Sequence, residues 1–573
     1  MLLLLADSIL VIFITLRIGV LTHYILEKIF RTRIQSDLLG MFLGGLITCS
    51  FYFNVLSCWL PINYLLLIPL TILSLSIGLR LRERVRQIRH SVWHSLKYIF
   101  SPANLLISLC LIATLFLFWI IPAGNTDSAG YHYLSILWYE KYKVVPGLAN
   151  IHGRLAFNPI SFIIQAAYSF TDPAGQSIYP LNGVIIGLFF SWLLIRMLKR
   201  KKSPAGLAYG VLIIMLYRAL LINISSPSPD ALVDVCMSYS MILLFEILLS
   251  GEVRLSQVVI PCLIILYSLT AKLYSFPMLL VLPFLFFLLP KNERKGALLL
   301  KVFGICLFMF VPWMIRNYIL SGYIIYPLPW FNFFHPDWQV SFNVLQYNYY
   351  DGAHRIAPSS SASSAFLSWL ANSIRIAPVN GLQEAAAILS PLCWILLYKK
   401  TKLTTPKVFG IWLIIYAGIW IWLFAAPVFR FGAVLISLSL LLPFLACLPD
   451  RSSGKSRLYS FLTSLLFICA ALYYIKTGSS KPTTYAFSLK DCWLYPLKDG
   501  RYKNNKADFP YTTLRSGVKL YMEDGIHECI NTELTCRVYY SGEIEMRGAS
   551  IDQGFKIVKD ETLPYSPFII IKR

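Results

Sequence analysis

Two aspartates in this sequence stand at the edges of long apolar segments, where a charged side chain is costly unless it has a function. Asp127 lies in GNTDSAGYHY and Asp230 lies in SSPSPDALVD. A carboxylate in such a place can serve as a general base, but aspartate is also a favoured N-cap residue, and both positions precede helical patterns. Asp234 follows Asp230 by one helical turn, so the pair suits a divalent cation such as Mg²⁺ or Mn²⁺, or a second acid role.

Four basic residues occupy comparable positions. They are Lys272 in LTAKLYSFP, Arg316 in PWMIRNYILSGY, Arg430 in APVFRFG, and Arg154 in the loop after Asp127. If these side chains converge, they would hold one anionic group, because arginine suits bidentate phosphate contact and lysine supplies a compact charge. The alternative is that each side chain snorkels to the lipid headgroups.

Tyr131 and His132 follow Asp127 in the same aromatic stretch. We expect Tyr131 to contact the substrate and His132 to assist Asp127 in catalysis. A histidine beside aromatic residues also commonly has a packing or capping role, so both interpretations of His132 stay open.

The composition determines the class of protein in which these residues act. Of 573 residues, 57% are hydrophobic and 14% are charged, whereas soluble proteins carry about 25% charged residues. This excludes a soluble enzyme and a nucleic-acid-binding chain, despite a net charge of +23. Basic clusters lie in short gaps between apolar runs, which is the positive-inside pattern of membrane proteins.

The hydropathy predicts an all-α polytopic membrane protein with about 14 transmembrane helices. The expected spans are 2–24, 37–57, 61–80, 103–121, 177–198, 204–222, 230–249, 256–270, 271–289, 297–316, 382–398, 407–424, 430–448 and 457–475. If residues 81–102 are cytoplasmic, every strong Lys/Arg cluster falls inside the cell. Residues 157–170 would then be a helix at the outer interface, because a further span would place Lys199–Lys202 outside.

We expect three regions along the chain. Residues 1–100 form a three-span addition with a basic cytoplasmic loop, and residues 101–475 form the catalytic membrane domain with large outer loops at 122–176 and 317–381. Residues 476–573 form a small outer domain, mostly β, because strand-like runs alternate there with turns. On an oxidising outer face, Cys529 and Cys536 would form a disulfide.

The arrangement of acids and cations resembles the GT-C superfamily of polytopic glycosyltransferases. Asp127 matches the acidic residue of its first outer loop, and Asp230 matches the acid of the next outer loop. LTAKLYSFP resembles a relaxed LTKGP-like element and points to Lys272, while a PW..R element ends in Arg316 and a late P..R element ends in Arg430. The whole chain is also similar to an uncharacterised, GT-C-like family of bacterial membrane proteins.

The resemblance implies a bacterial inner-membrane enzyme with its active site on the periplasmic side. It would move a sugar from a polyprenyl-phosphate donor to a glycan or lipid acceptor of the cell envelope, inverting the anomeric carbon, with Asp127 as base. The bilayer, the lipid-linked sugar and the acceptor are the implied partners, and no nucleic acid is expected. The alternatives are an O-antigen or capsule polymerase or ligase, and a transporter of lipid-linked sugars.

Overall fold

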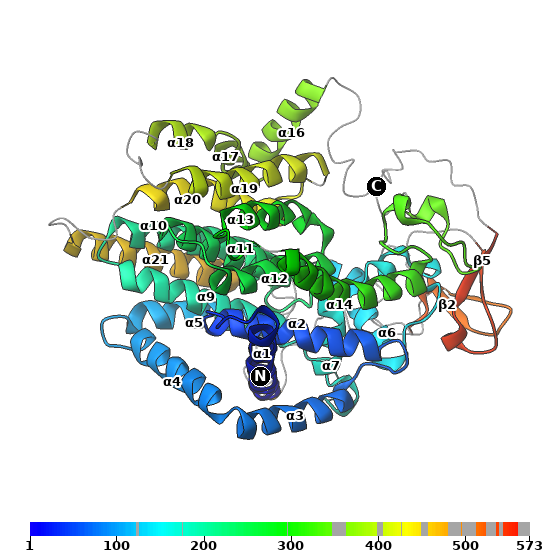
Figure 1. Ribbon diagram of the computed structural model, residues 1–573. Helices are drawn as coiled ribbons and strands as arrows, with labels where there is room; N and C mark the ends of the chain where they lie inside the picture. The colour runs from blue at the N-terminus through cyan, green and yellow to red at the C-terminus, as the bar shows by residue number, and fades with distance from the viewer. Residues whose placement is uncertain are drawn as a thin grey trace.

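The computed structural model shows a bundle of helices with a small β region at one end (Figure 1). It describes residues 1–121, 125, 127–174, 176–294, 296–345, 362–397, 405–425, 427–448, 456–479, 494, 511–522, 534–537 and 543–559. Within these residues the chain is mostly helical, as the sequence predicts.

Nine helices among the described residues are long and apolar enough to cross a membrane. They are α1 (Leu2–Phe30), α2 (Leu38–Leu56), α9 (Leu181–Arg200), α10 (Pro204–Leu220), α11 (Asp230–Leu249), α14 (Gly296–Ser321), α19 (Thr405–Ala425), α20 (Phe429–Cys447) and α21 (Ser456–Ser479). Each corresponds to an expected span, so the structure confirms a helical protein of the membrane type.

The other expected spans form shorter or bent helices. The pair α3 (Leu67–Arg80) and α4 (Arg82–Ile99) is bent by 96° and would bring the number to ten if it counts as one span. Shorter apolar helices are α5 (Leu105–Ile120), α12 (Leu255–Ala271), and the run of η6 (Leu273–Leu280) into α13 (Val281–Leu288). The region 362–397 is divided into α16 (Ala362–Ile376), α17 (Pro378–Ile388) and α18 (Pro391–Leu397). The total of about 14 spans stays a prediction.

Residues 157–170 do not form a full span. They contain α7 (Ile160–Tyr168), whose nine residues are all buried and would rise only about 14 Å. The helix packs against α2 and against α6 (Tyr133–Lys141). We expected it at the outer interface, but its apolar residues are covered by the bundle instead of by lipid.

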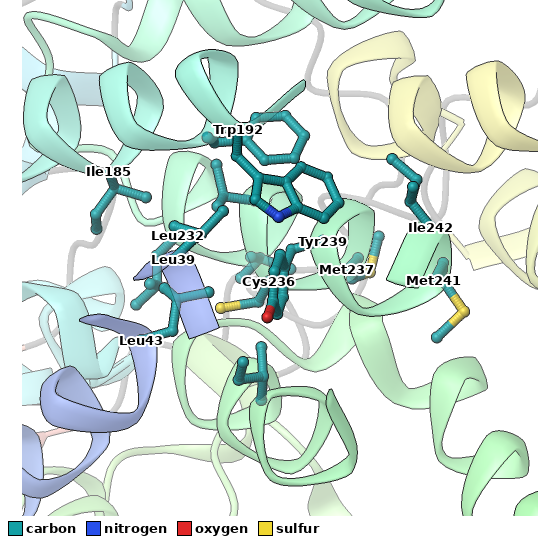
Figure 2. Packing of buried hydrophobic residues seen from close by; sticks show 14 of the residues in the cluster. Leu39, Leu43, Ile185, Trp192, Leu232, Cys236, Met237, Tyr239, Met241 and Ile242 are labelled. Atoms are coloured by element: carbon teal, nitrogen blue, oxygen red, sulfur yellow. The ribbon is translucent and has the colours of Figure 1, made fainter. Parts of the chain in front are cut away.

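Three helices, α2, α9 and α11, meet around Asp37, the N-cap of α2. Trp192 donates a hydrogen bond to one Asp37 oxygen at 2.5 Å and Tyr239 donates to the other at 3.0 Å. The two rings lie 5.0 Å apart within the apolar core (Figure 2). This core fixes α11, the helix that begins with Asp230.

Two small sheets make up the described part of the tail. One contains β1 (Tyr511–Thr513), β2 (Lys519–Met522) and β3 (Cys536–Arg537), with β1 and β2 antiparallel and β2 and β3 parallel. The other pairs β4 (Glu543–Met546) with β5 (Phe555–Lys559) in antiparallel fashion. The expected small β-rich region is therefore present. Cys536 is disulfide-bonded, but Cys529 lies outside the described residues.

The tail packs directly on the loops that follow α5 and α14. Phe555 donates its backbone N–H to the Pro146 carbonyl at 3.0 Å, and Asn150 donates from its side chain to the Phe555 and Trp338 carbonyls at 3.1 and 3.0 Å. The Arg547 guanidinium lies 2.9 Å from the Asp337 carboxylate. The described parts of the two loops around Pro146 and Trp338 therefore meet the tail at one place on the bundle.

A buried glutamate in this outer layer gives a pH-dependent stability. Glu140 is buried in α6, and burial raises the pKa of its carboxyl to about 7, with hydrogen bonds from Ser169 and Thr171 opposing the rise. Because this pKa exceeds that of the unfolded chain, stability falls as pH rises from about 4.5 to above 7. We expect Glu140→Gln to raise the Tm at pH 8 and to leave it nearly unchanged at pH 5, as thermal unfolding at the two pH values would show. Equal shifts at both would contradict this.

Candidate active site

Charged side chains from distant parts of the chain meet at one point. Arg430 forms an ion pair with Asp127 and also approaches Asp230, with 3.7 Å between its Nε and the carboxylate. Arg154 lies 3.4 Å from the other Asp127 oxygen, and Lys272 forms an ion pair with Asp230. Five of the residues expected from the sequence to carry chemistry therefore form one connected group.

Each of these residues lies at the start or end of a helix. Asp127 precedes a π-helical turn (Ser128–His132), and Asp230 is the first residue of α11. Lys272 lies at the break between α12 and η6, and Arg430 is in the first turn of α20. At the ends of helices the backbone leaves the helical path and its last N–H and C=O groups have no partner within the helix. Side chains at such ends, from separate helices, can therefore face one another. Arg154 belongs to the short helix Gly153–Ala156 in the outer loop.

The capping role considered for Asp127 is not what its side chain performs. Asp127 occupies the N-cap position, but its side chain makes no capping hydrogen bond. Its carboxylate oxygens contact Arg154 and Arg430 instead. The structure therefore places the carboxylate in the charged group.

This group borders a cavity of about 280 Å³. Asp127, Arg154, Lys272 and Arg430 supply the charged part of its lining. Aromatic side chains, among them Phe157, Trp313 and Tyr326, supply much of the remainder. A polar end joined to an apolar wall suits a ligand with a charged head and a hydrophobic portion.

The charges favour an anionic ligand. Two carboxylates, Asp127 and Asp230, face three cations, so one positive charge is left over in the group. Burial opposes ionisation of Asp127, but the neighbouring guanidinium groups of Arg430 and Arg154 outweigh it and hold the pKa of this carboxyl below its usual range. Asp127 is therefore ionised at neutral pH and able to accept a proton.

The Asn125 side chain links Arg430 to Asp127. Its side-chain oxygen accepts from Arg430 Nη1 and from the Asp127 backbone N–H, both at 3.1 Å. Its amide donates to the Asn223 side chain at 3.3 Å. One amide therefore links the loop of Asp127 to the loop before α11.

Asn182 continues this network from the first turn of α9. Its side-chain amide donates to the carbonyls of Ser226 and Ser228 at 2.6 and 2.8 Å. The Ser228 hydroxyl then accepts from the Asp230 backbone N–H at 3.3 Å. Sequence analysis did not identify Asn125 or Asn182, although an asparagine at the start of an apolar segment is a signal that could have found the latter.

The two aromatic residues after Asp127 differ in position. Tyr131 lines the cavity, as a substrate-contacting residue should. His132 is buried, and neither ring nitrogen has a hydrogen-bond partner in the described part of the chain. Its ring packs on Tyr131 and Phe162, and burial lowers its pKa to about 3. His132 is thus a neutral packing residue here, and the expected assistance to Asp127 is not seen.

Arg316 lies behind the cavity instead of in it. It is fully buried and donates to Asn158 at 3.1 Å and to Ser57 at 2.5 Å, with its guanidinium 4.6 Å from the Tyr139 ring. Asn158 in turn exchanges hydrogen bonds with the backbone and indole of Trp313, which lines the cavity. We expected Arg316 to contact phosphate. The structure instead places it behind the cavity wall, which it supports through Asn158.

The expected divalent-cation site at Asp230 and Asp234 does not form. Asp230 is paired with Lys272 and Arg430, and Asp234 accepts a hydrogen bond from Tyr274 at 2.8 Å. The described residues contain no group of three or more His, Cys, Asp or Glu side chains that could hold a metal ion. Lys272 and Arg430 lie where a metal ion would need to approach Asp230.

Comparison with known proteins gives one match. A family model, described as a domain of unknown function (DUF8201), matches residues 1–437. No curated protein matches the chain. No solved structure matches it. The matched range contains all the charged residues around the cavity.

Proposed function

The chain belongs to the DUF8201 family, and from its site we propose that it is a GT-C-like membrane glycosyltransferase. The enzyme moves a sugar from a polyprenyl-phosphate donor to a cell-envelope glycan or lipid on the outer face of the bacterial inner membrane. The observation that carries this proposal is the convergence of Asp127, Arg154, Lys272 and Arg430 on one partly apolar cavity, with Asp230 paired to Lys272 and close to Arg430. A lipid phosphate fits such a cavity, because it joins an anionic head to a hydrocarbon chain.

In the proposed reaction, Asp127 takes the proton from an acceptor hydroxyl as that oxygen attacks the anomeric carbon. The bond between this carbon and the phosphate oxygen breaks, and the lipid phosphate leaves with the electron pair. Its growing negative charge is stabilised by Arg430, Lys272 and Arg154, which are preorganised because they already line the cavity. Attack opposite the leaving group inverts the anomeric carbon.

Arg430 couples phosphate binding to the base. Its guanidinium is shared between Asp127, Asp230 and Asn125. A bound phosphate competes for this guanidinium and weakens its hold on Asp127. The pKa of Asp127 then rises towards its ordinary value, which makes the carboxylate a stronger base when the donor is in place.

A strain deleted for this protein and complemented with the wild-type chain tests the proposal by envelope glycan profiling. We expect the deletion strain to lack one sugar residue, and the wild-type chain to restore it. A change in chain length without loss of a residue would indicate the polymerase or ligase instead. Accumulation of an intact lipid-linked sugar on the inner leaflet would indicate a transporter.

A further inference from the structure

A second charged surface lies on α4, at the other end of the bundle from the cavity. Asn182 is near the start of α9, in the network behind the cavity, and α9 then runs for 20 residues, or about 30 Å. Just beyond its end, Lys201 donates to Asn104 at 2.7 Å and to Ala103 at 3.0 Å. Ala103 and Asn104 come a few residues after the end of α4 at Ile99. This end of α4 therefore lies about one membrane thickness from the cavity.

The helix α4 turns sharply away from the apolar helix before it. The axes of Tyr64–Arg80 and Arg82–Ile99 differ by 96°, and Figure 1 shows α4 leading from α3 along the edge of the bundle to α5. If α3 follows the membrane normal, α4 lies along the membrane surface. Arg84 fixes it there through a 2.7 Å contact with Glu27 of α1.

The residues of α4 divide into three faces. Every third or fourth residue falls on one side of a helix, and one such stripe packs on the bundle through Val85, Ile88 and Ile99. An exposed stripe carries Arg82, Arg86 and Arg89, and then Trp93, Leu96 and Phe100 at the same spacing. A third stripe, about 100° further round, carries Glu83, Gln87, His90 and His94, which are also exposed.

Part of the exposed stripe has no ion-pair partner among the described residues, although Arg82 lies 3.9 Å from Glu83 and Lys97 lies 5.3 Å from the Trp93 ring. Arg86 and Arg89 form no ion pair with any residue that the structure describes. Trp93 is 59% exposed and Phe100 is 42% exposed. Unpaired cations in line with exposed aromatic residues are the pattern of a helix that lies in the headgroup region of a membrane.

We propose that α4 is a binding site for anionic phospholipid, with Arg82, Arg86 and Arg89 on the lipid phosphates and Trp93, Leu96 and Phe100 inserted between the lipids. The polar third stripe then faces water. The positive-inside pattern alone would require only basic residues in this segment. Here the basic residues share one helix face with large apolar side chains, next to an apolar helix. Each cation near an anionic surface strengthens binding by about 1 kcal/mol, so loss of two cations should weaken it about 30-fold.

Hydrogen exchange of the full-length protein in lipid nanodiscs tests this site. We compare discs of phosphatidylcholine with discs that also contain phosphatidylglycerol, and follow peptides within 82–99. Phosphatidylglycerol should slow their exchange several-fold, and Arg86→Gln/Arg89→Gln should remove this protection. The matched control is Lys199→Gln/Lys202→Gln, which removes the same charge from an exposed cluster near the same end of the bundle and should retain it.

Three outcomes would overturn the proposal. The first is equal exchange of 82–99 in both kinds of disc. The second is equal loss of protection in the two double variants, which would indicate a diffuse charge effect. The third is slower exchange in phosphatidylcholine discs after a soluble polyanion is added, without slower exchange in discs that contain phosphatidylglycerol. This result would indicate a partner other than lipid.

Discussion

Asp127→Asn should abolish sugar transfer while the protein still reaches the membrane at normal abundance. Asparagine preserves the shape of the side chain but cannot take a proton from the acceptor. We expect at least about a 100-fold loss of transfer, as for removal of a general base. Envelope glycan profiling of the complemented deletion strain, with the protein level measured by immunoblot, would show the loss.

A second measurement separates a base from a structural residue. Asp127→Asn removes a negative charge beside Arg154 and Arg430, so these cations become more available to phosphate. The purified variant should therefore bind polyprenyl phosphate at least as tightly as the wild-type chain, although it cannot transfer sugar. Asp172→Asn is the matched control, because Asp172 is exposed and its ion-pair partner in the described part of the chain is Lys141. Normal transfer by Asp127→Asn, or weaker binding of the lipid phosphate, would contradict the role of Asp127.

The sequence indicated several of the charged residues that the structure brings together, whereas the number of spans stays a prediction. Charges beside apolar segments are costly enough to be conspicuous, and Asp127, Asp230, Lys272 and Arg430 are all of this kind. Hydropathy alone cannot distinguish a span from an apolar helix covered by other helices. This explains α7, which is apolar enough for a membrane but is short and fully buried.

The spatial roles of buried polar residues were beyond the reach of the sequence. Arg316 and Arg430 both stand at helix ends near the outer loops, and nothing local separates them. The structure does so through partners from far along the chain, since Arg316 binds Ser57 and Asn158. Asn125 and Asn182 are likewise defined by what they bridge. Such contacts depend on how distant helices pack, which periodicity does not encode.

Arg430→Gln should reduce both donor binding and transfer. Its guanidinium is the one group of the described site that contacts Asp127, Asp230 and Asn125 together, and removal of a preorganised donor to a developing anion costs about 100- to 1,000-fold in rate. Arg430→Lys keeps the charge but cannot reach three partners at once, so it should recover part of the binding and little of the rate. Binding of polyprenyl phosphate and transfer by the purified variants would measure the two effects.

The pH profile provides the sharper test of Arg430, because it reports on Asp127. Arg430 is the main group that lowers the pKa of Asp127 against the opposing effect of burial. Its removal should raise that pKa, so that the carboxylate is protonated at a higher pH and the acid limb of the transfer rate moves upward. Lys141→Gln alters an exposed ion pair away from the cavity. It should not change the pH at which the acid limb of the transfer rate falls. If Arg430→Gln lowers the rate equally at every pH, Arg430 acts on the phosphate alone and its coupling to the base is refuted.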